Sequence, residues 1–186
     1  MKILNVPNIL TLSRLFSIPI ILTLIYSNNA TLSLIAVVLF VMSSFTDQLD
    51  GYIARKYNLT TTFGIFFDPI VDKILILSMF FLLVDLRFIP LWMVLIFLFR
   101  EFLVTGIRQV GSLKGKIVGA NWMGKTKATL QIILITFAMI LITMNKFGKT
   151  IIYGNEVIYF GTLLLLLVTV IFTSIFVKWN LKLLLN

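Results

Sequence analysis

Residues 47–72 read DQLDGYIARKYNLTTTFGIFFDPIVD and hold four of the seven acidic residues of the chain. Asp47 and Asp50 are three positions apart, and Asp68 and Asp72 are four positions apart. Side chains at these spacings share one face of an α-helix. Apolar segments extend away on both sides, so we expect two antiparallel helices joined by the polar residues between them. The four carboxylates would then converge at one depth, just inside a membrane interface.

The chain as a whole is too apolar for a water-soluble protein. Of its 186 residues, 60% are hydrophobic and 12% are charged, and the mean hydropathy is +1.07, whereas soluble domains carry about 25% charged residues. A helix crosses a bilayer with about 20 apolar residues. The sequence therefore predicts an all-α, polytopic membrane protein with six transmembrane helices in the lipid bilayer, at residues 8–26, 32–54, 64–84, 90–110, 123–144 and 157–177.

No long polar stretch remains outside these segments, so residues 1–186 are predicted to form a single membrane domain. The first segment runs for about a full span without a small-residue cleavage site, so it is expected to be a retained helix. Arg14 lies near one end of this segment, and we expect its long side chain to extend to the interface.

Basic residues gather on one side of this topology. The opposite loops hold only Arg87, Lys146 and Lys149. By the positive-inside rule, both termini and the loops at 55–64 and 108–125 face the cytoplasm, in a multi-pass protein of the cell membrane. This pattern accounts for the net charge of +9, and no nucleic-acid partner is expected. The residues on the basic side are Lys2, Arg55, Lys56, Arg108, Lys114, Lys116, Lys125, Lys178 and Lys182.

The carboxylate cluster restricts the possible chemistry. The chain contains no cysteine and no histidine, so a metal would need oxygen ligands, which suit hard cations. Four unpaired carboxylates at a membrane interface are unfavourable unless they are protonated or bind cations. Glycines beside both pairs leave bare backbone that a phosphate-bearing ligand can approach, or that a second helix can pack against. From these residues alone, a metal site, a set of solvated acids and an ion or proton pathway all stay open.

The spacing Asp47-x2-Asp50-Gly51-x2-Ala54-Arg55-x8-Gly64-x3-Asp68-x3-Asp72 resembles, without deviation, the signature of the CDP-alcohol phosphotransferase family. This resemblance implies the fold of that family, with two divalent cations (Mg²⁺ or Mn²⁺) held by the four aspartates and Asp72 as the general base. It implies CDP-diacylglycerol as the donor. The residues implied to contact its CDP group are Gly51, Ala54, Arg55 and Gly64, and by analogy Asn8 and Thr11, although Asn8 also suits a helix N-cap.

Cations in the second half indicate an anionic acceptor. Arg100 and Arg108 lie on the fourth segment, and Lys125 and Lys127 open the fifth. Glycerol 3-phosphate would need such a site, whereas serine or inositol would need less positive charge; for the two lysines, attraction to anionic headgroups is the alternative. Residues 5–14, 100–108 and 124–131 are similar to family members that use glycerol 3-phosphate, which also implies a homodimer. The other hypotheses are a sibling enzyme using inositol phosphate, serine or phosphatidylglycerol, and an ion transporter.

Residues 119–126 (GANWMGKT) also fit the pattern of a phosphate-binding P-loop. That loop works between a β-strand and a helix of a soluble α/β domain, for which this chain has no room. We therefore expect Lys125 to act as an isolated charge at the start of a helix.

Overall fold

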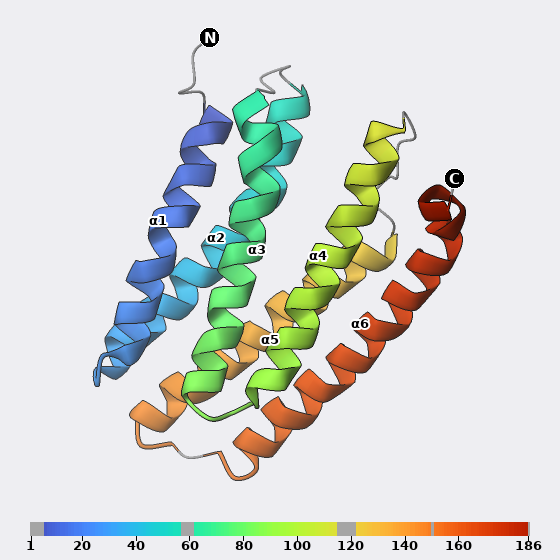
Figure 1. Ribbon diagram of the computed structural model, residues 1–186. Helices are drawn as coiled ribbons and strands as arrows, with labels where there is room; N and C mark the ends of the chain where they lie inside the picture. Colours follow the sequence, from blue (N-terminus) through green and yellow to red (C-terminus); the bar gives the residue numbers. More distant parts are fainter. Residues whose placement is uncertain (1–5, 57–61, 115–121, 150, 186) are drawn as a thin grey trace. The chain divides into compact units, whose positions relative to one another are not determined.

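The computed structural model describes residues 6–56, 62–114, 122–149 and 151–185, and side chains within 9–46, 67–111, 113–114, 122–149 and 151–180. Over these residues the chain forms six α-helices and no β-strand (Figure 1). Each helix overlaps one of the predicted apolar segments, so the all-α prediction is confirmed. The helices are α1 (Val6–Tyr26), α2 (Ala30–Lys56), α3 (Thr62–Asp85), α4 (Leu91–Leu113), α5 (Trp122–Lys146) and α6 (Gly154–Leu185).

Several helices have the length and apolar character of membrane spans. Three stretches in the described residues meet both requirements: Ile9–Tyr26, Trp122–Lys146 and Gly154–Asn180. A shorter apolar stretch, Ala30–Thr46, lies in α2. Large apolar side chains also point outward from the helices, among them Phe16, Phe99, Phe102 and Phe160. In water this surface would be unfavourable, so the helices are those of a multi-pass membrane protein.

The chain divides into two compact units. The first contains Met1–Leu82 and Ile135–Gly154, and the second contains Leu83–Leu134 and Asn155–Asn186. Two boundaries fall inside α3 and α5, so each of these helices contributes to both units, and the third falls after the first residue of α6.

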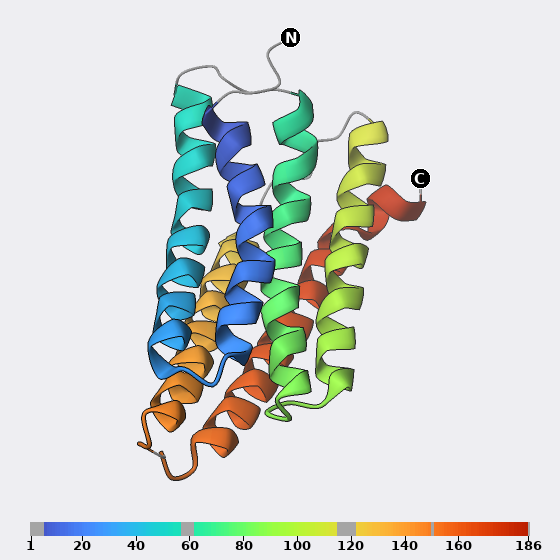
Figure 2. The same ribbon diagram turned by 90° about the vertical axis from the view of Figure 1, so that its left-hand side faces the viewer.

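In the first unit, α1 packs beside α2 and the start of α3 (Figure 2). Its buried face carries Ile21 and Ile25, and Phe40 of α2 and Met79 of α3 are buried in the same unit. The α1–α2 turn closes with Asn29, whose Oδ1 accepts the backbone N–H of Thr31 at 2.8 Å. Asn29 therefore caps α2 through its side-chain oxygen.

Lys146 fastens the end of α5 to this turn. Its ammonium donates to the carbonyl of Ile25, to the carbonyl of Ser27 (2.7 Å) and to Oγ of Ser33 (2.8 Å). An ammonium has three donors, and carbonyls at a helix C-terminus attract positive charge. Lys146 is thus a structural contact rather than a solvated loop charge.

In the second unit, α4 packs against α6 through Val104, Ile107 and Phe176, which form a small buried cluster with Leu103 and Val177 at its edge. Figure 1 shows these two helices side by side. This packing positions the polar residues of α4 beside those of α6.

Two helices end in the same hydrogen-bonded turn, a Schellman motif. At the end of α5, Lys149 N–H donates to Met144 O and Gly148 N–H donates to Asn145 O, both at 3.1 Å, with Gly148 at φ +74°. At the end of α3, Phe88 N–H donates to Leu83 O and Arg87 N–H donates to Val84 O, both at 2.9 Å. The left-handed position, which usually carries glycine, is occupied in α3 by Arg87 at φ +61°.

Candidate active site

Two of the four predicted metal-binding aspartates have described side chains. Asp68 and Asp72 lie one turn apart near the start of α3, and both are partly exposed. Their carboxylates face α1, because each accepts a hydrogen bond from a side chain of that helix. The i, i+4 spacing thus places both carboxylates on one face, as predicted.

Each of the two carboxylates has its own partner on α1, and these partners are three positions apart in the sequence. Thr11 donates its hydroxyl hydrogen to Oδ1 of Asp68 at 2.6 Å, and the guanidinium of Arg14 forms an ion pair with Oδ1 of Asp72. Thr11 and Arg14 are 1% and 2% exposed, respectively. Bonds between charged partners or to a carboxylate are stronger than neutral ones. The two contacts therefore fix the orientation of both carboxylates.

The prediction that Arg14 extends to the interface is wrong. Its side chain is 1% exposed, against 36% for its partner Asp72. Burying a guanidinium without a counter-charge is very costly, and the carboxylate of Asp72 removes that cost. The contact of Thr11 with the cytidine stays a prediction, and in the structure its hydroxyl donates to Asp68. One sequence feature could have indicated these contacts. Thr11 and Arg14 are three positions apart on an otherwise apolar face of α1, and the two aspartates of α3 have almost the same spacing.

The two described carboxylates, Asp68 and Asp72, suit a hard divalent cation. Carboxylate oxygens are the ligands that Mg²⁺ and Mn²⁺ prefer, and Asp68 and Asp72 supply two carboxylates on one helix face. Over the described side chains no group of three or more acidic residues comes together. The remaining predicted residues have helical backbone, but their side chains lie outside the described part of the chain; they are Asn8, Asp47, Asp50, Gly51, Ala54, Arg55 and Gly64.

In the second unit, two predicted acceptor cations meet on one acid. Oε1 of Glu101 accepts from Arg100 at 3.1 Å and forms an ion pair with Lys127 of α5. Nε of Arg100 also donates to Oγ1 of Thr173 on α6 at 3.0 Å. The side chains of Arg100, Glu101 and Lys127 are 11%, 14% and 7% exposed. We call these three residues and Thr173 the Glu101 cluster.

The other two predicted cations do not join the Glu101 cluster. Arg108 lies about two turns further along α4 with its guanidinium carbon 5.8 Å from the ring centroid of Phe176, a cation–π contact. Its Nε is buried without an acceptor among the described residues. Lys125 is exposed on α5. The sequence had drawn attention to the cations and not to Glu101, which organises two of them.

Comparison with known proteins gives the family. The sequence model described as CDP-alcohol phosphatidyltransferase matches residues 4–179. A relative from Rickettsia typhi is 41% identical over 149 residues, 80% of this chain and 82% of the relative. One from Bacillus subtilis is 39% identical over 144 residues, 71% and 75% of the two chains. Both carry the name CDP-diacylglycerol–glycerol-3-phosphate 3-phosphatidyltransferase.

A more distant relative from Salmonella choleraesuis carries the same name and is 31% identical over 140 residues, 73% of this chain and 76% of the relative. The family match spans both the α3 carboxylates and the Glu101 cluster. Lys125 lies in the first turn of α5, at the start of a helix as predicted, and no β-strand occurs in the described residues. The chain belongs to the CDP-alcohol phosphatidyltransferase family, which confirms the resemblance read from residues 47–72.

Proposed function

We propose that the protein transfers the phosphatidyl group of CDP-diacylglycerol to sn-glycerol 3-phosphate, releasing CMP and forming phosphatidylglycerol phosphate. Membership of the family supports a CDP-activated donor. The observation that carries the acceptor is the Glu101 cluster: two buried cations on one acid leave net positive charge that suits a phosphorylated alcohol. The printed names of the relatives agree with this choice.

The carboxylates of Asp47, Asp50, Asp68 and Asp72 would hold two divalent cations, Mg²⁺ or Mn²⁺, whose chemistry when bound is to neutralise charge on the pyrophosphate and on the leaving CMP. The family is generally dependent on divalent metals. Thr11 keeps the Asp68 carboxylate in one orientation, and Arg14 does the same for Asp72. Such supporting contacts matter because small errors in ligand position weaken metal binding and catalysis.

In the transfer step, the acceptor hydroxyl oxygen forms a bond to the β-phosphorus of the donor, and the bond from that phosphorus to the CMP oxygen breaks. Asp72 takes the hydroxyl proton as general base. We place the CDP group against Gly51, Ala54, Arg55 and Gly64, with Arg55 as a forked phosphate donor. Asn8 would contact the cytidine.

The acceptor phosphate would bind Arg100 and Lys127, with Arg108 and Lys125 as further donors. Glu101 and Thr173 hold the guanidinium of Arg100 in place before the acceptor arrives. Preorganised cations lose less entropy on binding an anion than mobile ones do. The Glu101 cluster would therefore act as an acceptor site separate from the donor contacts.

We expect Arg100→Ala and Lys127→Ala each to raise the apparent KM for glycerol 3-phosphate by about tenfold, because a charged hydrogen bond contributes about 1.5–3 kcal/mol. The KM for CDP-diacylglycerol should change little. Steady-state CMP release with each substrate varied in turn measures both constants. Lys149→Ala, which removes an exposed cation elsewhere, is the matched control. An equal change in both KM values would contradict a separate acceptor site.

The acceptor itself is tested by CMP release from purified protein with Mg²⁺ or Mn²⁺ and a panel of alcohols. We expect release with glycerol 3-phosphate and little with serine, inositol, inositol phosphate or phosphatidylglycerol. Release with one of the latter and not with glycerol 3-phosphate would make the chain a sibling enzyme. Metal movement into liposomes without CDP-lipid, together with no CMP release, would instead indicate a transporter.

We further propose that all six helices cross the cell membrane as one domain, with both termini and the carboxylates on the cytoplasmic side, and that the protein is a homodimer. The asymmetry of basic residues supports this orientation. The donor's acyl chains could then stay in the bilayer while its CDP group reaches the interface.

A further inference from the structure

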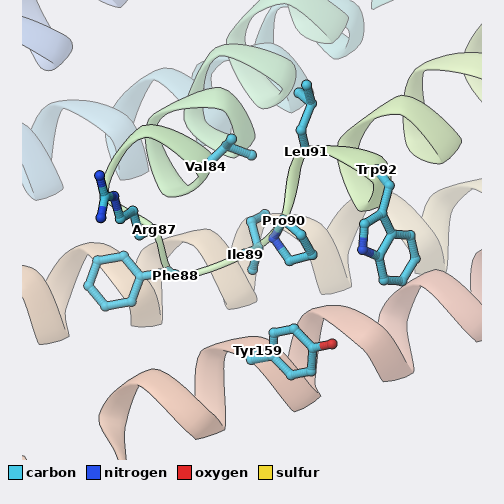
Figure 3. A pocket seen from close by; sticks show the side chains of 8 residues that line it. All are labelled: Val84, Arg87, Phe88, Ile89, Pro90, Leu91, Trp92 and Tyr159. Atoms are coloured by element: carbon cyan, nitrogen blue, oxygen red, sulfur yellow. The ribbon is translucent and has the colours of Figure 1, made fainter.

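A recess of about 560 Å³ opens where α3 passes into α4, within the second unit (Figure 3). Its lining includes Arg87, Phe88, Ile89 and Pro90 of the turn, Trp92 of the first turn of α4, and Tyr159 of α6. In Figure 3, Arg87 and Trp92 lie at opposite ends of the recess, with Pro90 between them and Tyr159 on the facing helix. The volume lies in the range of small-ligand sites, about 300–1,000 Å³.

The backbone conformation of Arg87 lowers the stability of the fold. It occupies the left-handed position of a Schellman turn at φ +61°, whereas the same turn after α5 uses Gly148. A non-glycine residue in this conformation costs free energy, and such strained residues gather at functional sites. In the orientation proposed above, Arg87 is also one of three basic residues in the loops where the positive-inside rule disfavours them.

The recess combines one positive charge, two neutral donors and apolar walls. Arg87 is its charged lining residue, and no carboxylate pairs with Arg87 among the described residues. Trp92 and Tyr159 add an indole N–H and a phenol O–H. The acids nearest in sequence, Asp85 and Glu156, do not line the recess. The matching ligand is an anion attached to an apolar body.

We propose that this recess binds the phosphodiester headgroup of an anionic phospholipid. The chain lies in a bilayer, so lipid is the abundant ligand of this kind at the end of a helix. Tryptophan and tyrosine favour the level of the headgroups, and arginine pairs with phosphate through parallel N–H bonds. A free phosphate ion would use the guanidinium but leave the faces of Phe88 and Pro90 uncovered.

The test uses the full chain carrying Trp122→Phe and Trp179→Phe, so that Trp92 is the remaining tryptophan. The protein is kept in neutral detergent with EDTA and without CDP-lipid. Dihexanoyl-phosphatidylglycerol is titrated while Trp92 emission is recorded. We expect saturable binding, about tenfold tighter than that of dihexanoyl-phosphatidylcholine, because the arginine contact is charge-assisted. Because no substrate or metal is present, the result does not depend on the proposed reaction.

Arg87→Gly is the decisive variant. It removes the guanidinium and places the favoured residue in the turn, so the Tm should not fall while the affinity for the anionic lipid falls about tenfold. Lys149→Gln, a cation in the corresponding turn after α5, should leave the affinity unchanged. Tyr159→Phe should weaken binding less than Arg87→Gly does. Equal affinity for both lipids, unchanged affinity in Arg87→Gly, or displacement by equimolar inorganic phosphate would overturn the proposal.

Discussion

Asp72→Asn should lower the turnover of CMP release by about 10²–10⁴-fold, the usual contribution of a general base, while CDP-diacylglycerol still binds. Asparagine keeps the size of the side chain and one oxygen ligand, but it does not accept the proton of the acceptor hydroxyl. Turnover is measured under saturating substrates, and donor binding is measured separately on the inactive variant. More than about a tenth of wild-type turnover would argue against a base.

The ion pair with Arg14 makes a control necessary. Asp72→Asn also leaves the buried guanidinium of Arg14 without its counter-charge, and removing one partner of a buried pair can cost about 3–5 kcal/mol, less here because Asp72 is 36% exposed. The double variant Arg14→Gln/Asp72→Asn removes both charges. If Asp72 is the base, the double variant regains thermal stability but stays inactive. Recovery of turnover in the double variant would show that Asp72→Asn lost turnover through its effect on Arg14 and not through loss of a base.

Removal of divalent cations should abolish CMP release, by about 10³-fold or more, because cation stabilisation of the transferring group is worth several kcal/mol. Dialysis against EDTA followed by Mg²⁺ or Mn²⁺ should restore it. Persistence of CMP release at high EDTA would exclude the two-metal proposal.

A second measurement separates metal binding from catalysis. Without substrates, Mn²⁺ should raise the Tm of the wild-type protein, since a ligand bound to the native state stabilises it. Asp68→Ala should lose this increase, and Glu156→Ala, which removes an exposed acid at the start of α6, should keep it. Equal increases in all three proteins would place the cation away from α3.

The helices could be predicted from sequence because their signal is local. Six apolar segments, separated by turn residues, predict the helix ends to within three positions, except that α6 ends eight residues beyond its predicted segment. The common face of Asp68 and Asp72 could also be predicted, because both residues lie on one helix, four positions apart. These properties depend on residues close together in the chain.

The contacts that organise the sites are not local, and the sequence did not predict them. Thr11 and Asp68 are 57 positions apart, and Lys127 and Glu101 are 26 apart. The place of Arg14 near one end of the first segment predicts extension to the interface, whereas its partner Asp72 lies 58 positions away in the sequence. The sequence suggests headgroup attraction as an alternative for Lys125 and Lys127 alike, whereas in the structure Lys127 pairs with Glu101 and Lys125 is exposed.

The pairing between α1 and α3 has a consequence for biosynthesis. Arg14 leaves the ribosome 58 residues before Asp72, an interval of about 3–12 s at 5–20 residues per second. During that time the α3 carboxylate that pairs with Arg14 has not yet been made, and a charge within a span is costly. We expect α1 to stay near the translocon or the headgroups until α3 has been synthesised and inserted. The pairing of the Asp72 carboxylate with Arg14 would then coincide with the release of the first helix into the bilayer.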